Sequence, residues 1–400
     1  MRLGSIATGA DFFDRRTECE DLWRYLADDH VVVSGPRRLG KSSIVTRVRE
    51  EAEAKELLVQ YIDVEGIKSA QKFIDLLASH FPENFVARHL NSLGTHAKQW
   101  LSLVKKVDIK VPGGIGGGIE FQVGATASWQ TAALALQQRL TDVPALIFID
   151  EFSVFLEKLL KQDAKEAESL LAWLRAWRIR PGVACRFLFT GSIGLNALLE
   201  SHGLTAYFND CVDYRVGPFK SQPARDMIAA FTRESKWTID DTSTNHLCNR
   251  VGWLSPYYLC LLLDQTMQAA RDRVDETATP ETARNTLIQD DIDVAYERLI
   301  SARSRFVHWD KRLERMLSPN DLTFVRRILT LIARKPEGLT NRQLHARLAK
   351  IEPDPDKRAS RMLDALRKLT EEGYISPPDT GAQVRFLSFL LRDYWARNHV

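Results

Sequence analysis

The sequence lacks the features of membrane and secreted proteins. No run in its 400 residues approaches the roughly 18 uninterrupted apolar residues that a membrane span needs, and the residues before Thr17 contain no apolar secretory stretch. Its five cysteines form no C-x-x-C pair and have no histidine at zinc-ligand spacing, which excludes a disulfide framework and a zinc knuckle. We therefore expect a cytoplasmic protein with no membrane partner.

An excess of charge of one sign is also missing. The chain carries 55 basic and 52 acidic side chains, a net charge of +3, which excludes a polycation that coats nucleic acid. The positive charge is local: residues 320–400 contain 15 basic and 10 acidic side chains, whereas the first 319 residues contain 40 and 42. With 44% hydrophobic residues, a chain of this length predicts two or three domains.

The first half of the chain alternates short apolar strands with helical segments. Each strand ends in polar or glycine residues, and the four strands are Val31–Val33, Leu57–Ile62, Ala145–Ile149 and Arg186–Phe189. Continuous apolar runs are typical of a parallel sheet that helices cover on both faces, so we predict an α/β fold. Such sheets bind ligands at the carboxyl ends of their strands, where the polar residues stand.

One segment breaks this pattern. In Lys105–Thr126, two stretches of alternating hydrophobic residues flank a run rich in glycine, which predicts a β-hairpin with a flexible tip. No lysine or serine follows these glycines as a phosphate loop requires.

Beyond residue 220 the pattern becomes helical. Residues 221–317 predict a small all-helical domain. Residues 318–400 predict three helices, Asp321–Arg334, Asn341–Ala349 and Lys357–Glu372, followed by two short strands, which is a winged helix-turn-helix pattern. The predicted domains are therefore 1–220, with the hairpin at about 105–126, then 221–317 and 318–400.

A phosphate-binding signature follows the first strand. Residues 35–42 match G-x-x-x-x-G-K-[ST] and precede a predicted helix. In such a loop the backbone N–H groups face the phosphates, Lys41 reaches the β- and γ-phosphates, and Ser42 offers its hydroxyl to Mg²⁺. Arg37 and Arg38 either add charge near the phosphates or pair with neighbouring acids. The predicted nucleotide-binding residues are Gly35, Pro36, Arg37, Arg38, Leu39, Gly40, Lys41, Ser42 and Ser43.

An acidic pair ends the third strand. Asp150 is placed to meet Mg²⁺, and Glu151 is placed to orient and deprotonate the water that attacks the γ-phosphate. After the fourth strand, Thr190 or Ser192 is predicted to sense the γ-phosphate, and the sequence does not choose between them. The chain has neither the N-K-x-D of guanine-binding proteins nor the L-S-G-G-Q of transporter ATPases, and the acidic pair fits a small-molecule kinase poorly.

Five segments together resemble the archaeal-type ATPases, which belong to the AAA+/STAND division of P-loop NTPases and are related to origin-recognition ATPases. The segments are FDRRTE at 13–18, GPRRLGKSS at 35–43, IDEF at 149–152, TGSIG at 190–194 and PYYL at 256–259. The resemblance spans almost the whole chain, because it implies an AAA+-like parallel sheet, a helical lid and a C-terminal winged helix.

The resemblance implies ATP and Mg²⁺ as cofactors, Glu151 as catalytic base and Pro256 as a lid residue near the adenine. Two departures concern the rate of hydrolysis. Phe208-Asn209-Asp210 stands where the family often has a glycine–arginine pair, and Gly252 lies farther from Pro256 than in the usual lid motif. Both departures favour slow hydrolysis rather than loss of nucleotide binding.

Two hypotheses for the partner remain open. In the first, the winged helix couples the nucleotide state to double-stranded DNA through its basic residues, Lys357, Arg358, Arg361, Arg367 and Lys368. In the second, a STAND-like switch uses the winged helix and the hairpin to dock a partner or effector protein. Nucleotide-dependent assembly into a homo-oligomer is a further expectation.

Overall fold

The computed structural model describes residues 6–54, 58–81, 129–140, 145–191, 194–277, 285–376 and 383–399. They form two compact units, which we treat separately. The sheet unit comprises Arg15–Ser34 and Ile44–Arg215, and the helical unit comprises Met1–Asp14, Gly35–Ser43 and Val216–Val400. The predicted hairpin at 105–126 and Ser192 lie outside the described residues, and the predicted domain boundaries stay a prediction. No helix in the described part of the chain is long and apolar enough to cross a membrane.

The sheet unit contains a five-stranded parallel sheet, which confirms the predicted α/β class. Its strands are β1 (His30–Ser34), β2 (Leu58–Asp63), β3 (Ala145–Asp150), β4 (Arg186–Thr190) and β5 (Cys211–Arg215). Their order is β2-β3-β4-β1-β5, so the carboxyl ends of β3, β4 and β1 are neighbours. β5 escaped the strand prediction because it pairs at the edge, where burial alternates along the strand and leaves no continuous apolar run.

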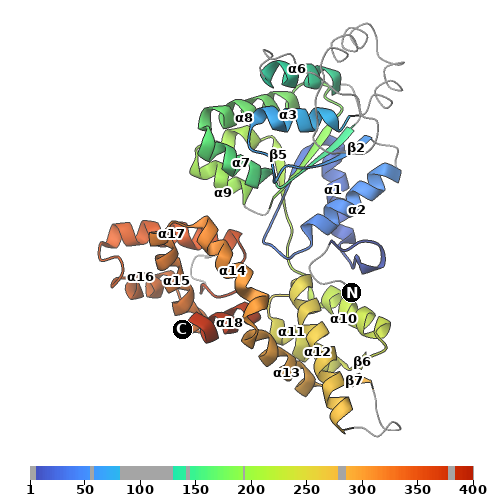
Figure 1. The fold of residues 1–400 in the computed structure, drawn as a ribbon, viewed down its shortest axis with the longest axis vertical. Helices are drawn as coiled ribbons and strands as arrows, with labels where there is room; N and C mark the ends of the chain where they lie inside the picture. The colour runs from blue at the N-terminus through green and yellow to red at the C-terminus, as the bar shows by residue number, and fades with distance from the viewer. Residues whose placement is uncertain are drawn as a thin grey trace. The chain divides into compact units, whose positions relative to one another are not determined.

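Helices cover both faces of this sheet, as its continuous apolar strands require (Figure 1). On one face Ile149, Phe187 and Phe189 join a core with the buried sides of several helices. On the other face lie α1 and α2, whose Leu22 and Ile44 are fully buried. The helices of the first face are α3 (Ala70–Ser79), α6 (Trp129–Leu140), α7 (Phe152–Gln162), α8 (Ala164–Arg178) and α9 (Leu195–Ser201), and those of the second are α1 (Arg16–Asp28) and α2 (Lys41–Ala54).

A buried polar network lies within the sheet unit. The guanidinium of Arg178 binds the carboxylate of Asp210 through two hydrogen bonds of 2.7 and 3.0 Å. The Nδ1 atom of His30 accepts the Phe187 N–H at 3.0 Å, so Nε2 carries the proton and donates to the Arg178 carbonyl at 3.2 Å. Burial lowers the pKa of His30 to about 4, and this histidine is therefore a neutral, structural residue at neutral pH.

Four helices of the helical unit lie in the region after residue 220, where the sequence predicted helices. They are α10 (Ser221–Glu234), α11 (Asp241–Val251), α12 (Pro256–Thr277) and α13 (Gln289–Ser301). The region also contains a parallel pair of two-residue strands, β6 (Thr238–Ile239) and β7 (Thr286–Leu287). Two residues per strand are too few to give an alternating pattern, so the sequence predicted helices alone.

The C-terminal part of this unit has the predicted order of helices and strand pairings. After α14 (Arg303–Met316) come α15 (Pro319–Ala333), α16 (Asn341–Arg347) and α17 (Pro355–Glu371). Antiparallel bridges then join Leu339 to Val384 and Ile375 to Phe386. Thr340 caps α16: its hydroxyl accepts the Gln343 N–H at 3.2 Å, and the Gln343 side chain accepts the Thr340 N–H at 2.9 Å.

A last helix, α18 (Phe389–His399), was not predicted, and it forms hydrogen bonds with α13 and α15. The Tyr296 hydroxyl of α13 donates to Asp393 at 2.6 Å, and the Trp395 indole donates to Thr330 of α15 at 3.2 Å. Trp395 is fully buried. α13, α15 and α18 therefore pack as one body within the helical unit.

Candidate functional site

Three residues of the phosphate loop have positive φ angles, which glycine adopts easily and other residues rarely adopt. The loop starts directly after β1 and continues into the first turn of α2. Gly35 has φ +128°, and a Cβ there would lie 2.5 Å from the Val216 carbonyl oxygen, so only glycine fits. Gly40 has φ +84°, and Arg38, with φ +69°, adopts a left-handed conformation that is unusual for a residue with a side chain.

Lys41 is held over its own loop. Its ammonium group donates to the carbonyl oxygens of Gly35 at 2.7 Å and Pro36 at 3.0 Å. Ser42, the predicted Mg²⁺ ligand, is exposed, whereas Leu39 is buried. Ser43, the last predicted residue of the loop, accepts the Ala7 N–H at 2.9 Å through its hydroxyl.

Other parts of the helical unit contact the loop. The Ser255 hydroxyl donates to the Arg38 carbonyl at 2.6 Å, and the Arg38 guanidinium lies 4.2 Å from the centre of the Tyr257 ring. Arg38 therefore stacks on an aromatic side chain, and Arg37 is partly buried. Pro256, the predicted adenine neighbour, stands between Ser255 and Tyr257 at the start of α12.

A second contact reaches the loop from the end of α17. A Cβ at Gly373 would lie 2.7 Å from Pro36 Cβ, and Gly373 has φ +82°. Glycine is therefore needed at this position both for the backbone and for the close approach to the loop.

In the sheet unit, donors from three strand ends converge on the Asp150 carboxylate. Oδ1 accepts the Thr190 hydroxyl and the Glu151 N–H, the latter at 2.9 Å, and Oδ2 accepts the Tyr61 hydroxyl. Parallel pairing places Asp63 beside Asp150, and Asp63 is exposed, as expected for a solvated loop acid. Burial raises the pKa of Tyr61 and the hydrogen bond to Asp150 raises it further, so this phenol remains a donor at neutral pH.

Glu151 occupies the turn between β3 and α7 in a left-handed conformation, with φ +56°. Such a conformation costs about 1–2 kcal/mol for a residue with a Cβ, and strained residues are frequent at functional sites. The next turn is also tight: a Cβ at Gly191 would lie 2.0 Å from the Ser153 hydroxyl oxygen, so only glycine lets α7 begin this close to the end of β4.

The carboxylate fits Mg²⁺ bound together with a nucleotide. In the described ranges no group of three or more His, Cys, Asp or Glu side chains could hold a metal by itself. Mg²⁺ commonly uses one or two carboxylates with phosphate oxygens and water, rather than a cage made by protein alone. Asp150 supplies such a carboxylate at the carboxyl end of β3, and Thr190, one of the two predicted sensors, contacts it directly.

Asp210 has a structural role at the position where an arginine was expected from the resemblance. Burial alone would raise its pKa, but hydrogen bonds and the charge of Arg178 outweigh that effect and hold the pKa below its usual range. Arg178 itself is fully buried. The pair therefore stabilises the turn before β5.

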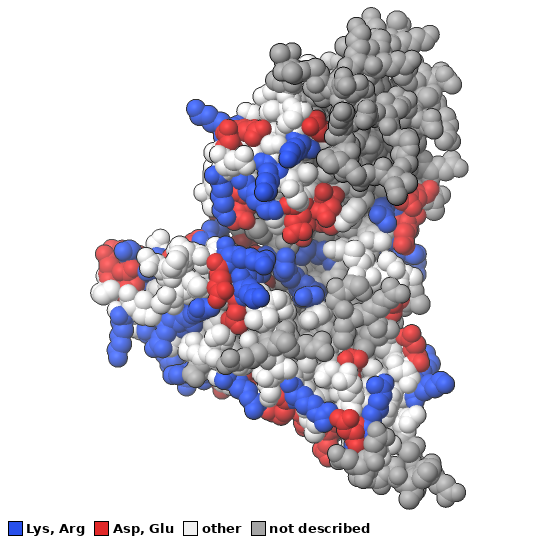
Figure 2. All heavy atoms as spheres, viewed as in Figure 1, with Lys and Arg blue, Asp and Glu red and all other residues white. Residues whose placement is uncertain are grey.

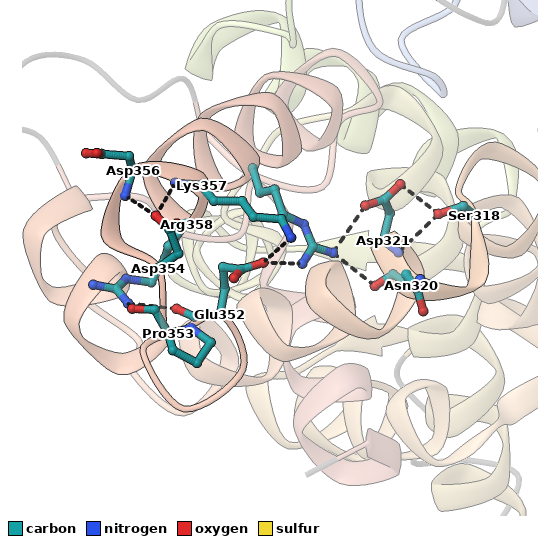
Figure 3. Close-up of polar contacts among 10 residues, drawn as sticks. Ser318, Asn320, Asp321, Glu352, Pro353, Asp354, Asp356, Lys357 and Arg358 are labelled. Atoms are coloured by element: carbon teal, nitrogen blue, oxygen red, sulfur yellow. Dashed lines mark hydrogen bonds and ion pairs between the residues drawn. The ribbon is translucent and has the colours of Figure 1, made fainter.

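The basic residues predicted to bind DNA are largely engaged within the helical unit. Arg358 is 8% exposed and donates to the carbonyls of Glu352 at 2.7 Å and Pro353 at 3.0 Å (Figure 3). Arg361 binds Glu352 and Asp321, both at 3.2 Å. Arg367 and Lys368 both pair with Asp364, at 2.9 and 2.7 Å, and the mostly exposed Lys357 pairs with Glu352 at 3.6 Å.

Exposed cations occur instead on and after α16. Arg342, Arg347 and Lys350 are exposed, and Figure 2 shows Lys and Arg side chains gathered over α15 and α16. The start of α17 is acidic, with exposed Asp354 and Asp356. Arg342, Arg347 and Lys350 were not among the residues predicted to bind DNA, although their spacing of five and three residues on and after a short polar helix is a signal in the sequence.

The strand order, with the loop at 35–43 after β1 and the acidic pair after β3, defines an α/β fold of the AAA+ type. The fold is similar to that of the Walker-type ATPase PABY2304 of Pyrococcus abyssi, with a TM-score of 0.64 and 17% identity over 98% of this chain and 99% of that one. It is also similar to the ORC2 protein of Aeropyrum pernix in ADPNP–ADP complexes, with a TM-score of 0.54 and 15% identity over 96% and 92% of the two chains. No protein-family model and no curated protein matches the sequence. The structural comparisons confirm the AAA+-like fold of the parallel sheet that the resemblance implied, while the helical lid and the winged helix stay predictions.

Replacing Arg358 by Ala should destabilise the helical unit. The substitution deprives the carbonyls of Glu352 and Pro353 of their charged donor, which should lower the free energy of unfolding by about 2 kcal/mol. A urea titration monitored by tryptophan fluorescence measures the free energy of unfolding. The matched control is Lys357→Ala, which removes a mostly exposed cation that pairs with Glu352 at 3.6 Å and should change stability by less than about 1 kcal/mol. Equal stability of the two variants would show that Arg358 is not an interior residue.

Proposed function

We propose that this chain is a Mg²⁺-dependent ATP hydrolase that acts as a molecular switch. The observation that carries the proposal is the arrangement at the end of β3, where Asp150 accepts converging hydrogen bonds and Glu151 follows it in a strained turn. The same sheet continues from β1 into the phosphate loop. A metal-binding carboxylate followed by a second acid is the combination that hydrolysis requires beyond binding.

In this proposal each part of the site has one task. The loop N–H groups and Lys41 hold the β- and γ-phosphates, for which Lys41 exchanges its present carbonyl partners. Ser42 and Asp150 hold Mg²⁺, which neutralises the charge that develops on the phosphates. Glu151 orients and deprotonates the attacking water, and Thr190 senses the γ-phosphate through the carboxylate that it binds.

Hydrolysis is expected to be slow. Residues 209 and 210, in the turn before β5, are Asn and Asp, so this turn supplies no arginine to the γ-phosphate. Arg178 is hydrogen-bonded to Asp210. An arginine at that stage of a phosphoryl transfer contributes about 10³–10⁵ in rate. A slowly hydrolysing ATPase keeps its nucleotide state long enough to act as a switch.

Replacing Glu151 by Gln should separate binding from hydrolysis. The amide keeps the size of the side chain but cannot take a proton, so the hydrolysis rate should fall by about 10²–10⁴ while ATP affinity stays within about twofold. Phosphate release under single-turnover conditions gives the rate, and calorimetry gives the affinity. A variant that hydrolyses ATP at the parent rate would mean that another group activates the water.

We further propose that the nucleotide state is coupled to double-stranded DNA through the predicted winged helix. The support is the local excess of basic residues in 320–400 and the exposed cations of α16. Because Arg358 and Arg361 hold Glu352, Pro353 and Asp321, we assign the phosphate contacts to Arg342, Arg347 and Lys350 in preference to them.

A partner protein is the alternative ligand of the same domain. The exposed side of α17 carries Leu363, which is 55% exposed, and the helix starts with Asp354 and Asp356. An acidic helix start repels the DNA backbone, whereas an exposed leucine beside charged residues suits protein docking. This observation keeps an effector protein as the second candidate.

Changing Arg342, Arg347 and Lys350 together to Ala should weaken binding of duplex DNA. For every phosphate that loses its cation, the slope of log affinity against log salt should become shallower by about 0.9, because fewer counterions are released. Fluorescence anisotropy at several salt concentrations measures both the affinity and the slope.

The matched control removes three exposed cations from the sheet unit by changing Lys161, Lys165 and Arg180 to Ala. The two variants have the same net charge, so a general charge effect would weaken both equally. If only the α16 variant binds more weakly and with a shallower slope, DNA is bound there. If the parent protein binds no duplex at any salt concentration, the partner-protein alternative takes its place.

A further inference from the structure

Tyr61 lies outside every nucleotide-binding motif of the chain, yet its hydroxyl donates to Oδ2 of Asp150. The two residues are 89 positions apart in the sequence. Parallel pairing of β2 with β3 brings them together: Tyr61 stands opposite Phe148, and Asp63 stands opposite Asp150. Because side chains alternate along a strand, Tyr61 and Asp150 point to the same face of the sheet.

The hydroxyl fills a defined place in the hydrogen bonding of the carboxylate. An ionised carboxylate has about four lone-pair positions on its two oxygens. The Thr190 hydroxyl and the Glu151 N–H use those of Oδ1, and the Tyr61 hydroxyl uses one of Oδ2. The described donors therefore leave one lone-pair position of the carboxylate unused, and this position is on Oδ2. The same three hydrogen bonds keep the carboxylate from rotating, so the direction of this lone pair is fixed.

The Tyr61 ring is itself held from the other side. The guanidinium of Arg49, on α2, lies 5.5 Å from the centre of the ring. A cation over an aromatic face is attracted by the ring, so Arg49 and Asp150 fix the tyrosine between α2 and β3. α2 is also the helix that follows the phosphate loop.

We propose that Tyr61 is a positioning residue for the metal site, which aims the remaining lone pair of Asp150 at the Mg²⁺ of the bound nucleotide. The inference rests on the proposed function, and it concerns how this chain holds its metal ligand. Partners that orient a metal ligand typically contribute about 10–100-fold to metal affinity. Tyr61 should therefore affect nucleotide binding only when Mg²⁺ is present.

The test compares the affinity for ADP in Mg²⁺ and in EDTA, by calorimetry, for the full chain and for Tyr61→Phe. Loss of the hydroxyl should weaken Mg²⁺-ADP binding by about 10–100-fold and leave ADP binding in EDTA unchanged. The control is Tyr207→Phe, which removes a tyrosine hydroxyl donated to Glu168 at 2.9 Å elsewhere in the sheet unit and should change neither affinity.

Each outcome has a distinct meaning. If Tyr61→Phe loses affinity equally in Mg²⁺ and in EDTA, Tyr61 has a merely structural role and the inference is wrong. If the variant binds as the parent does under both conditions, the inference is also wrong, while the proposed function stands. A parent protein that binds no ADP in either condition would overturn the proposed function together with the inference.

Discussion

Hydrogen bonds to the Asp150 carboxylate join the carboxyl ends of three neighbouring strands. Tyr61 of β2, Thr190 of β4 and the N–H of Glu151, which follows β3, donate them. These hydrogen bonds offset the cost of taking a polar group partly out of water, and they fix the direction of the carboxylate. The strained turn at Glu151 is stabilised by the same carboxylate, so the geometry of the predicted metal ligand and that of the predicted base are set together.

In the helical unit, ion pairs and hydrogen bonds engage most of the cations of α17, whereas cations on and after α16 are exposed and can contact a partner. Arg358 and Arg361 connect the start of α17 to α15 and to the segment before α17, and Arg361 also lies 4.4 Å from the centre of the Phe324 ring. The helix expected to read DNA thus uses its cations for folding, while α16 exposes others. The loop contacts at Ser255 and Gly373 show that the residue before α12 and the segment after α17 both touch the loop at 35–43 within this unit.

The sequence predicted the features that local spacing determines. Continuous apolar runs located four of the five strands, and the motif at 35–42 with the acidic pair supplied the candidate nucleotide-binding residues. Edge strand β5 has no such run. α18 was missed although Ser388, whose hydroxyl accepts the Leu391 N–H at 3.4 Å, stands at its N-terminus. Tyr61 could not be found because only the pairing of β2 with β3 brings it to Asp150. The burial of Arg358 could not be found either, since a cation on a polar helix is usually exposed.

The proposed switch requires that the loop at 35–43 binds the phosphates of ATP through Lys41. Calorimetric titration of Mg²⁺-ATP into Lys41→Ala, beside the parent protein, measures this contribution. Lys41 is a side-chain cation that the motif aims at the β- and γ-phosphates, so we expect heat of binding for the parent and none for the variant at the same concentrations. An unchanged affinity in the variant would show that ATP does not bind through Lys41 of this loop.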